Sequence, residues 1–168
     1  FSATLPKEIA ELAKKFLKDP ITVRIESRAT AENVEQNVIN VRKKDQKVDI
    51  LHDLLLKEDF QKVLIFCRTK RGAERLSKTL LESGFKSDSI HGDKSQSQRE
   101  RALRRFEENA LQVLVATDVA ARGLDIDDVT HVINFDVPET YEDYIHRIGR
   151  TGRGGKTGNA LTFIEEEK

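Results

Sequence analysis

The stretch of sequence that decides the fold is VLIFCRTKRGAERLSKTLLESG, residues 63–84. Its first four residues, Val63–Phe66, form a continuous apolar run, which is typical of a strand that is buried on both faces of a sheet. Residues 70–83 follow as a predicted helix, and Gly84 comes just after it, where glycine commonly ends a helix. A buried strand that leads directly into a helix is the repeating unit of an α/β fold.

The same alternation of strand and helix patterns continues along the chain in both directions. Because strands alternate with helices, the connections should be right-handed crossovers between parallel strands. The predicted fold class is therefore α/β, a single domain with a parallel sheet and helices on both faces. Further strands are predicted at 38–41, 87–90, 113–116, 132–135 and 160–164, and further helices at 9–17, at 46–58, after the capping box at 95–98, and at 140–148.

The composition describes one ordinary domain whose charges cancel. Across 168 residues, 29 Lys and Arg stand against 29 Asp and Glu. Zero net charge excludes a uniformly basic coat, so a nucleic-acid site would have to be a local patch. The sequence has no long apolar run and no signal-peptide pattern, which favours a cytosolic protein. Its one cysteine, Cys67, cannot form an internal disulfide, and no Cys/His cluster has zinc spacing. Because methionine is absent, we expect a fragment of a longer protein.

Three polar clusters directly follow predicted strands, namely Arg68-Thr69-Lys70, His91-Gly92-Asp93 and Thr117-Asp118. In a parallel sheet, ligands bind outside the carboxyl ends of the strands. Each cluster alone has a simpler explanation, because Thr69 can merely cap a helix and His91-Gly92-Asp93 can merely turn the chain. Three such clusters at one edge favour a binding site.

The segment richest in candidate chemistry is HRIGRTGRGGKT, residues 146–157. Its arginines recur at every third position and are interleaved with glycines. Guanidinium groups are planar, bidentate donors that suit phosphate oxygens, and glycines let the backbone approach closely. The pattern therefore indicates phosphate binding, and the alternative is a solvated basic turn.

No phosphate-binding loop accompanies these arginines. Gly155-Lys156-Thr157 resembles the end of a Walker A loop, but that motif needs a glycine where Arg150 stands. The segment also leads into a predicted strand instead of a helix. An Asp-Glu-Ala-Asp box is likewise absent from the sequence. We therefore expect another domain to hold the nucleotide, and this one to supply arginine fingers.

Taken together, these motifs resemble those of the DEAD-box RNA helicases. The segment IHGDKSQSQRER, residues 90–101, is similar to that of bacterial RhlE-like members. The resemblance covers nearly the whole chain in order, with SAT at 2–4 (motif III), VLIFCRTK at 63–70 (motif IV), Gln96–Arg99 (the QxxR element), ATDVAARGLD at 116–125 (motif V) and HRIGRTGR at 146–153 (motif VI).

The resemblance implies a RecA-like fold and a place in a two-domain enzyme. DEAD-box proteins have two RecA-like domains around a cleft, and residues 37–168 are similar to the second. Residues 1–20 would then be a remnant of the first domain with a lead-in helix, and residues 21–36 a linker. ATP and Mg²⁺ would be held mainly by the first domain, so the chain alone is expected to be inactive.

The resemblance also implies roles for individual residues. Arg150 and Arg153 match the arginines that reach the γ-phosphate, and Asp125 matches the residue that contacts the ribose. A turn aspartate is the alternative for Asp125, a solvated helix arginine for Arg99, and structural ion pairing for Arg122 and Arg147. The positions implied in RNA binding are Thr69, Lys70, Gly92, Arg99 and Thr117, and those implied in coupling the two domains are Arg122, His146 and Arg147.

By the same resemblance, the full-length protein would be an ATP-dependent RNA helicase that unwinds duplexes locally or remodels RNA–protein complexes. Its partners would be RNA, bound through the sugar-phosphate backbone without sequence preference, and the N-terminal RecA-like domain of the same protein, with no membrane partner. We expect a cytoplasmic location and a monomeric isolated domain.

A non-catalytic RNA-binding or scaffold module that retains the fold is the alternative from another class. Intact Arg150, Arg153 and Asp125 argue against it, because a scaffold needs none of them. A stand-alone nucleotide-binding enzyme is excluded by the missing phosphate loop.

Overall fold

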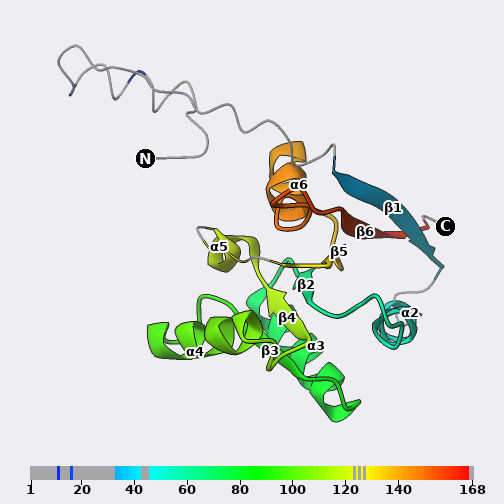
Figure 1. Ribbon diagram of the computed structural model, residues 1–168, viewed down its shortest axis with the longest axis horizontal. Coiled ribbons are helices and arrows are strands. Elements are labelled where there is room, and N and C mark those ends of the chain that lie inside the picture. The colour runs from blue at the N-terminus through cyan, green and yellow to red at the C-terminus, as the bar shows by residue number, and fades with distance from the viewer. Residues whose placement is uncertain are drawn as a thin grey trace.

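The computed structural model describes residues 33–42, 46–122, 124, 126 and 128–166, together with Glu11 and Phe16. Its centre is a six-stranded sheet in the order β1-β6-β5-β2-β4-β3 (Figure 1). All neighbouring strands are parallel, as the alternation of strands and helices predicts. The strands are β1 (Val34–Val41), β2 (Val63–Phe66), β3 (Ser87–Ile90), β4 (Val113–Ala116), β5 (His131–Asn134) and β6 (Gly158–Glu165).

Helices cover both faces of the sheet, because successive side chains of the central strands point to opposite faces. Val63 and Ile65 of β2 pack with α2 and α3 in one hydrophobic cluster. Leu64 and Phe66 of the same strand pack with α4 and α5 in the other. The described helices are α2 (Gln46–Leu55), α3 (Lys70–Glu82), α4 (Gln96–Glu107), α5 (Asp118–Ala121) and α6 (Tyr141–Ile148).

Side chains that the sequence singles out define the ends of α3 and α4. Thr69 is the N-cap of α3, and its hydroxyl accepts a hydrogen bond from the backbone N–H of Gly72 at 3.0 Å. Gly84 follows α3 with a φ of 93°, a left-handed conformation that favours glycine. Ser95 and Gln98 form the predicted capping box of α4, with bonds of 3.3 and 2.9 Å. These caps fix where the segments between strand and helix begin and end.

The first strand begins earlier than the apolar pattern predicts. β1 starts at Val34, so residues 34–36 belong to the strand and the predicted linker 21–36 is wrong there. The physical reason is that β1 is an edge strand paired only with β6. Most of its side chains are exposed, including Val38 at 59%, so the strand carries polar residues that resemble a loop in sequence.

Several other predictions differ from the structure or fall outside the described residues. The strand predicted at 160–164 extends over Gly158–Glu165, and the helix predicted at 46–58 ends at Leu55. The four-residue helix α5 was not expected, because it is too short for a helical period to show. Apart from Glu11 and Phe16, the helix predicted at 9–17 lies outside the described residues.

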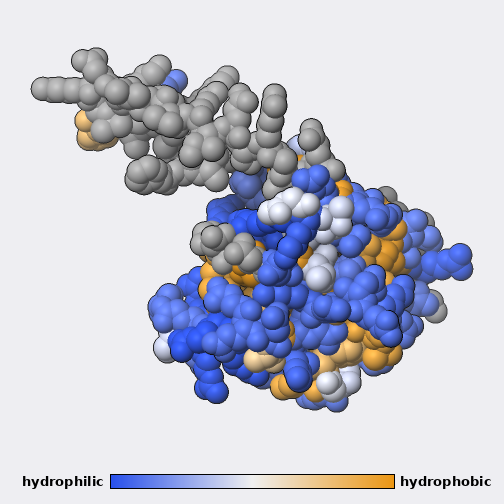
Figure 2. Space-filling model, in the orientation of Figure 1, coloured by the Kyte–Doolittle hydropathy of each residue, from blue (hydrophilic) through white to orange (hydrophobic). Residues whose placement is uncertain are grey.

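The surface is mostly hydrophilic on the face shown in Figure 2, with hydrophobic residues in smaller areas between the charged ones. The largest exposed apolar side chains near the carboxyl ends of the strands are Val119 of α5 and Tyr141 of α6. Of the helices that the structure describes, none has the length and apolarity required to cross a membrane.

His131 is the buried first residue of β5. Its ring stacks on Phe60 with centroids 3.7 Å apart, and burial lowers its pKa against a weaker opposing effect of Asp59. The unfolded chain therefore binds more protons than the folded one near pH 6, so the free energy of unfolding should rise between pH 5 and pH 7. Urea denaturation across this range should show a shallower pH dependence for His131→Asn. His52→Asn, at the partly exposed histidine of α2, is the control and should keep the wild-type slope.

Candidate functional site

The three polar clusters that follow strands lie at one edge of the sheet. They continue β2, β4 and β3, which are adjacent in the order β2-β4-β3. Because all three strands are parallel, their carboxyl ends meet at the same edge. We call the segments 68–70, 91–93 and 117–118 the carboxyl-edge cluster.

Lys70 and Gly92 lie in close contact within this cluster. The Lys70 ammonium forms an ion pair with Asp93 at 2.7 Å, and both side chains are more than half exposed. Hydrogen bonding from Lys70 holds the pKa of the Asp93 carboxyl below its usual value. A Cβ on Gly92 would lie 3.2 Å from Cε of Lys70, so a larger residue would crowd the lysine. Thr69, the N-cap of α3, precedes this lysine.

Arg99 contacts α5, and Thr117 is the N-cap of that helix. Arg99, in the first turn of α4, donates from Nη2 to the carbonyl oxygen of Ala120 at 3.4 Å. Its Nε is buried and has no hydrogen-bond partner among the described residues. Thr117 is the buried N-cap of α5, but its hydroxyl makes no capping hydrogen bond there. Both side chains therefore hold polar atoms that the described part of the fold does not use.

Arg147 is buried, and each of its three guanidinium nitrogens donates a hydrogen bond. Its Nε and Nη2 donate to the two carboxylate oxygens of Asp118 at 2.6 and 2.7 Å. Its Nη1 donates to Oδ1 of Asn134 at 3.2 Å and to the carbonyl oxygen of Asp136 at 2.7 Å. The guanidinium also lies over the ring of Phe66, 5.1 Å from its centroid. These contacts support structural ion pairing, the alternative that the sequence left open for this residue.

Arg122 and His146 line a small recess between α5 and α6 that Arg147 and Arg150 also line. Arg122 is exposed and pairs with Asp143 at 3.4 Å. The hydroxyl of Thr140, and secondly Arg122, hold the pKa of Asp143 below its usual value. The structure therefore brings the three predicted coupling residues together around one recess, with Arg147 buried beneath it.

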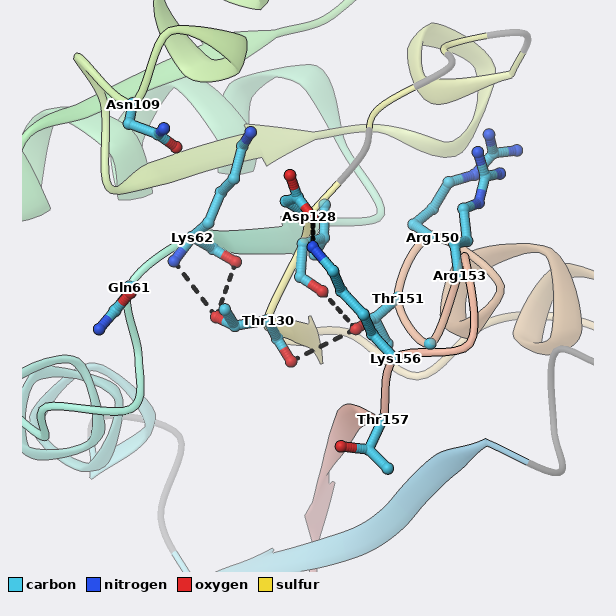
Figure 3. Close-up of a pocket in the computed structure, with 12 residues that line it drawn as sticks. Gln61, Lys62, Asn109, Asp128, Thr130, Arg150, Thr151, Arg153, Lys156 and Thr157 are labelled. Carbon is cyan, nitrogen blue, oxygen red and sulfur yellow. Dashed lines mark hydrogen bonds and ion pairs between the residues drawn. The ribbon is translucent and has the colours of Figure 1, made fainter.

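The arginine-rich segment forms the connection from α6 to β6 and borders a larger cavity (Figure 3). Arg150 donates to the carbonyl oxygen of Leu124, and Arg153 Nε donates to that of Gly149 at 2.9 Å. The cavity has a volume of about 520 Å³, with Lys62 and Asn109 across from the two arginines. It is lined by Gln61, Lys62, Asn109, Asp128, Val129, Thr130, Arg150, Thr151, Gly152, Arg153, Lys156 and Thr157.

This cavity lies at the amino ends of the strands, because residues 61–62 precede β2, 128–130 precede β5 and 156–157 precede β6. The sequence led us to expect ligand-binding residues at the carboxyl ends of the strands. The carboxyl-edge cluster lies there, but this cavity does not. The sequence did not single out Lys62 and Asp128, which line this cavity. Nothing in their local pattern distinguishes them, since they line the cavity only after the sheet has formed.

The side chains of Thr151 and Lys156 anchor the arginine segment, and Gly152 lets it approach β1 closely. The Thr151 hydroxyl donates to the backbone carbonyl oxygen of Val129. Gly152 has a φ of 71°, and a Cβ there would lie 2.8 Å from Cγ2 of Val34. Lys156 pairs with Asp128, and the chain then enters β6. The segment is therefore no Walker A loop, in agreement with the sequence.

Asp125 lies outside the described residues. Cys67 is buried, and burial, followed by the charge of Asp136, raises the pKa of its thiol to about 12. A thiol with such a pKa stays protonated at neutral pH, as expected for a packed residue that is not a nucleophile.

The parallel sheet, the arginine segment and the carboxyl-edge cluster define a RecA-like helicase domain. Residues 46–155 match the family model described as helicase conserved C-terminal domain. The chain belongs to this family, and within it to the DEAD-box proteins.

Relatives and solved structures agree with this assignment. The chain is 48% identical over 165 residues to the DEAD-box ATP-dependent RNA helicases CshA of Geobacillus kaustophilus and Bacillus subtilis. The match covers 98% of this chain but only 35% and 33% of those proteins, so the chain spans about a third of their length. S. cerevisiae Dbp5 bound to RNA and ADP BeF3 is 31% identical, with a TM-score of 0.80 over 99% of this chain and 44% of that chain. E. coli SrmB bound to the regulator of ribonuclease activity A is 38% identical, with a TM-score of 0.73 over 77% of this chain and 76% of that chain.

Proposed function

We propose that this domain is the C-terminal half of an enzyme that couples ATP hydrolysis to local RNA unwinding or to remodelling of RNA–protein complexes. The observation that carries the proposal is the buried Arg147–Asp118 pair. Asp118 directly follows Thr117 of the carboxyl-edge cluster, and Arg147 lies three residues before Arg150. One rigid contact therefore joins the proposed RNA side to the proposed nucleotide side.

On the nucleotide side, Arg150 and Arg153 would stabilise the charge that develops on the transferred phosphoryl group. Asp125 would contact the ribose. The described residues contain no group of three His, Cys, Asp or Glu side chains that could hold a metal ion. We propose that the preceding RecA-like domain holds the Mg²⁺ and the nucleotide.

On the RNA side, the carboxyl-edge cluster and Arg99 would bind the sugar-phosphate backbone. Lys70 supplies a point charge, Arg99 a guanidinium with an unused Nε, and Thr117 a hydroxyl outside any capping bond. Gly92 permits close approach of the backbone. Contacts of these kinds position a strand without reading its bases.

In this proposal, Arg122 and His146 contact the preceding domain from the recess beside α6, and Arg147 positions them from within. A monomeric state of the domain alone and a cytoplasmic location stay predictions from the sequence. Residues 1–20 as a remnant of the first domain, with a linker up to the start of β1, are likewise part of the proposal.

The proposal is tested by comparing this chain with a protein that joins it to the preceding domain. RNA-stimulated ATP hydrolysis and separation of a short RNA duplex should appear only in the two-domain protein, because the chain alone has no phosphate loop. A two-domain protein that binds RNA without hydrolysing ATP would favour the scaffold alternative. Hydrolysis by the chain alone, abolished by Arg150→Ala, would contradict the two-domain account.

A further inference from the structure

Glu74, in the second turn of α3, gathers three donors on one carboxylate oxygen. Its Oε2 lies 2.7 Å from Oγ of Ser89, 3.1 Å from Nε2 of His91 and 3.5 Å from Nζ of Lys94. Hydrogen bonds from Ser89 and then His91 lower the pKa of Glu74 to about 2. The carboxylate is therefore ionised at neutral pH and connects α3 to β3 and to the turn at 91–94.

The buried ring of His91 transmits this contact to the turn. The backbone N–H of Asp93 donates to its Nδ1 at 3.4 Å, so Nε2 carries the proton that is donated to Glu74. The backbone N–H of Lys94 donates to the carbonyl oxygen of His91 at 3.1 Å. With both ring nitrogens bonded, the ring orients the backbone on either side of Gly92.

The same network reaches α4. Lys94 also pairs with Asp88 at 3.0 Å, and Asp88 pairs with Arg105 of α4 at 3.4 Å. Helix α4 begins with the turn that carries Arg99. The network thus joins α3, the 91–94 turn and α4, which carry Lys70, Gly92 and Arg99 respectively.

A second link between α3 and the turn is exposed to solvent. It is the pair of Lys70 and Asp93, whose side chains are 53% and 64% exposed. A phosphate that binds Lys70 competes with Asp93 for the ammonium. Once Lys70 has turned to the phosphate, the turn is held against α3 through Glu74.

We propose that Glu74 is a positioning residue for RNA binding, whose carboxylate holds the 91–94 turn against α3 so that Lys70, Gly92 and Arg99 meet one RNA strand together. The inference rests on the proposed RNA-binding function. It assigns to Glu74 no contact with RNA.

Whether RNA affinity rises or falls when the Glu74 charge is removed distinguishes positioning from simple electrostatic repulsion. Glu74 is an anion near the proposed phosphate path, so removing its charge would by itself raise the affinity for a polyanion. Positioning predicts the opposite. Glu74→Gln keeps the shape of the side chain, and its amide oxygen can still accept at the Oε2 position, but the amide lacks the charge that attracts Lys94 and strengthens the hydrogen bonds from Ser89 and His91.

The experiment measures binding of a fluorescent single-stranded oligouridylate to this 168-residue chain by anisotropy. We expect Glu74→Gln to weaken binding about three- to tenfold, a fraction of what charge-assisted hydrogen bonds contribute. Glu82→Gln removes the same charge from an exposed site on the same helix, and should leave the affinity unchanged or slightly higher. Asp93→Asn should tighten binding slightly, and in that background Glu74→Gln should cost more than it does alone.

Two further measurements exclude a merely structural effect. The ¹⁵N signals of the His91 ring should report a weaker hydrogen bond from Nε2–H in Glu74→Gln, and the folded fraction at the assay temperature should stay that of wild type. Ser89→Ala, which removes one of the three donors, should weaken binding less than Glu74→Gln.

The outcomes separate the two proposals. If wild type fails to bind, or Arg99→Ala leaves binding unchanged, the RNA-binding function itself is wrong. If Arg99→Ala weakens binding while Glu74→Gln leaves it unchanged or tighter, the function stands and positioning by Glu74 is overturned. A loss of affinity that only follows a loss of folded protein also overturns it.

Discussion

Replacing Arg150 with alanine in the proposed two-domain protein is expected to lower RNA-stimulated ATP turnover by about 10³-fold, the lower end of the range for arginine fingers. The guanidinium would act mainly when negative charge develops on the transferred phosphoryl group. Nucleotide affinity should fall much less than turnover, because most ground-state contacts belong to the other domain. RNA affinity without nucleotide should hardly change, since Arg150 is not among the residues proposed to contact RNA.

Turnover, nucleotide affinity and RNA affinity should be measured side by side on wild type, Arg150→Ala and Arg150→Lys. Lysine should not restore turnover, because an ammonium lacks the planar fork of a guanidinium. Lys156→Gln is a control in the same segment and should have a smaller effect, since Lys156 is paired with Asp128. If turnover survives while RNA affinity collapses, Arg150 is a nucleic-acid contact and the assignment is wrong.

Replacing Arg147 with alanine is expected to lower the free energy of unfolding by about 3 kcal/mol, the lower end of the cost of breaking a buried ion pair. The change leaves the Asp118 carboxylate and the buried Oδ1 of Asn134 without their donor. We place the effect at the lower end because the Asp118 side chain is 30% exposed and keeps access to water. Urea denaturation of this chain measures the change directly.

Arg122→Ala is the matched control for this prediction. Its side chain is 69% exposed and its ion pair with Asp143 measures 3.4 Å, so its loss should cost less than about 1 kcal/mol. An Arg147→Ala protein that is as stable as wild type, yet loses RNA-stimulated turnover in the proposed two-domain protein, would show that Arg147 acts directly between the domains.

The central part of the fold could be predicted because its residues carry local signals. The buried strands β2 and β4 have uninterrupted apolar sequences, and Thr69, Gly84 and Ser95 mark helix ends through bonds and backbone conformations that depend on near neighbours. The start of β1 could not be predicted, because an edge strand gains its stability from pairing with β6, more than 100 residues away in sequence.

The candidate site was predictable only as a set of residues. The motifs named the arginines and gave Arg147 and Arg150 different roles, but the sequence left open whether Arg147 couples the domains or forms a structural ion pair. The pairing follows from Asp118 and Asn134, which reach Arg147 only through the tertiary fold. The contacts of Glu74 were equally invisible, because a glutamate on a helix is ordinarily a solvated residue.

In the proposed account, the carboxyl-edge cluster and Arg99 bind the sugar-phosphate backbone of RNA. The most direct test is the affinity of the 168-residue chain for single-stranded RNAs of equal length and different sequence, measured at several salt concentrations for wild type and Arg99→Ala. The account predicts similar affinities for all sequences, a fall in affinity with salt, and a uniform loss with a shallower salt dependence for Arg99→Ala. A strong preference for one sequence, or binding that ignores both salt and Arg99, would contradict it.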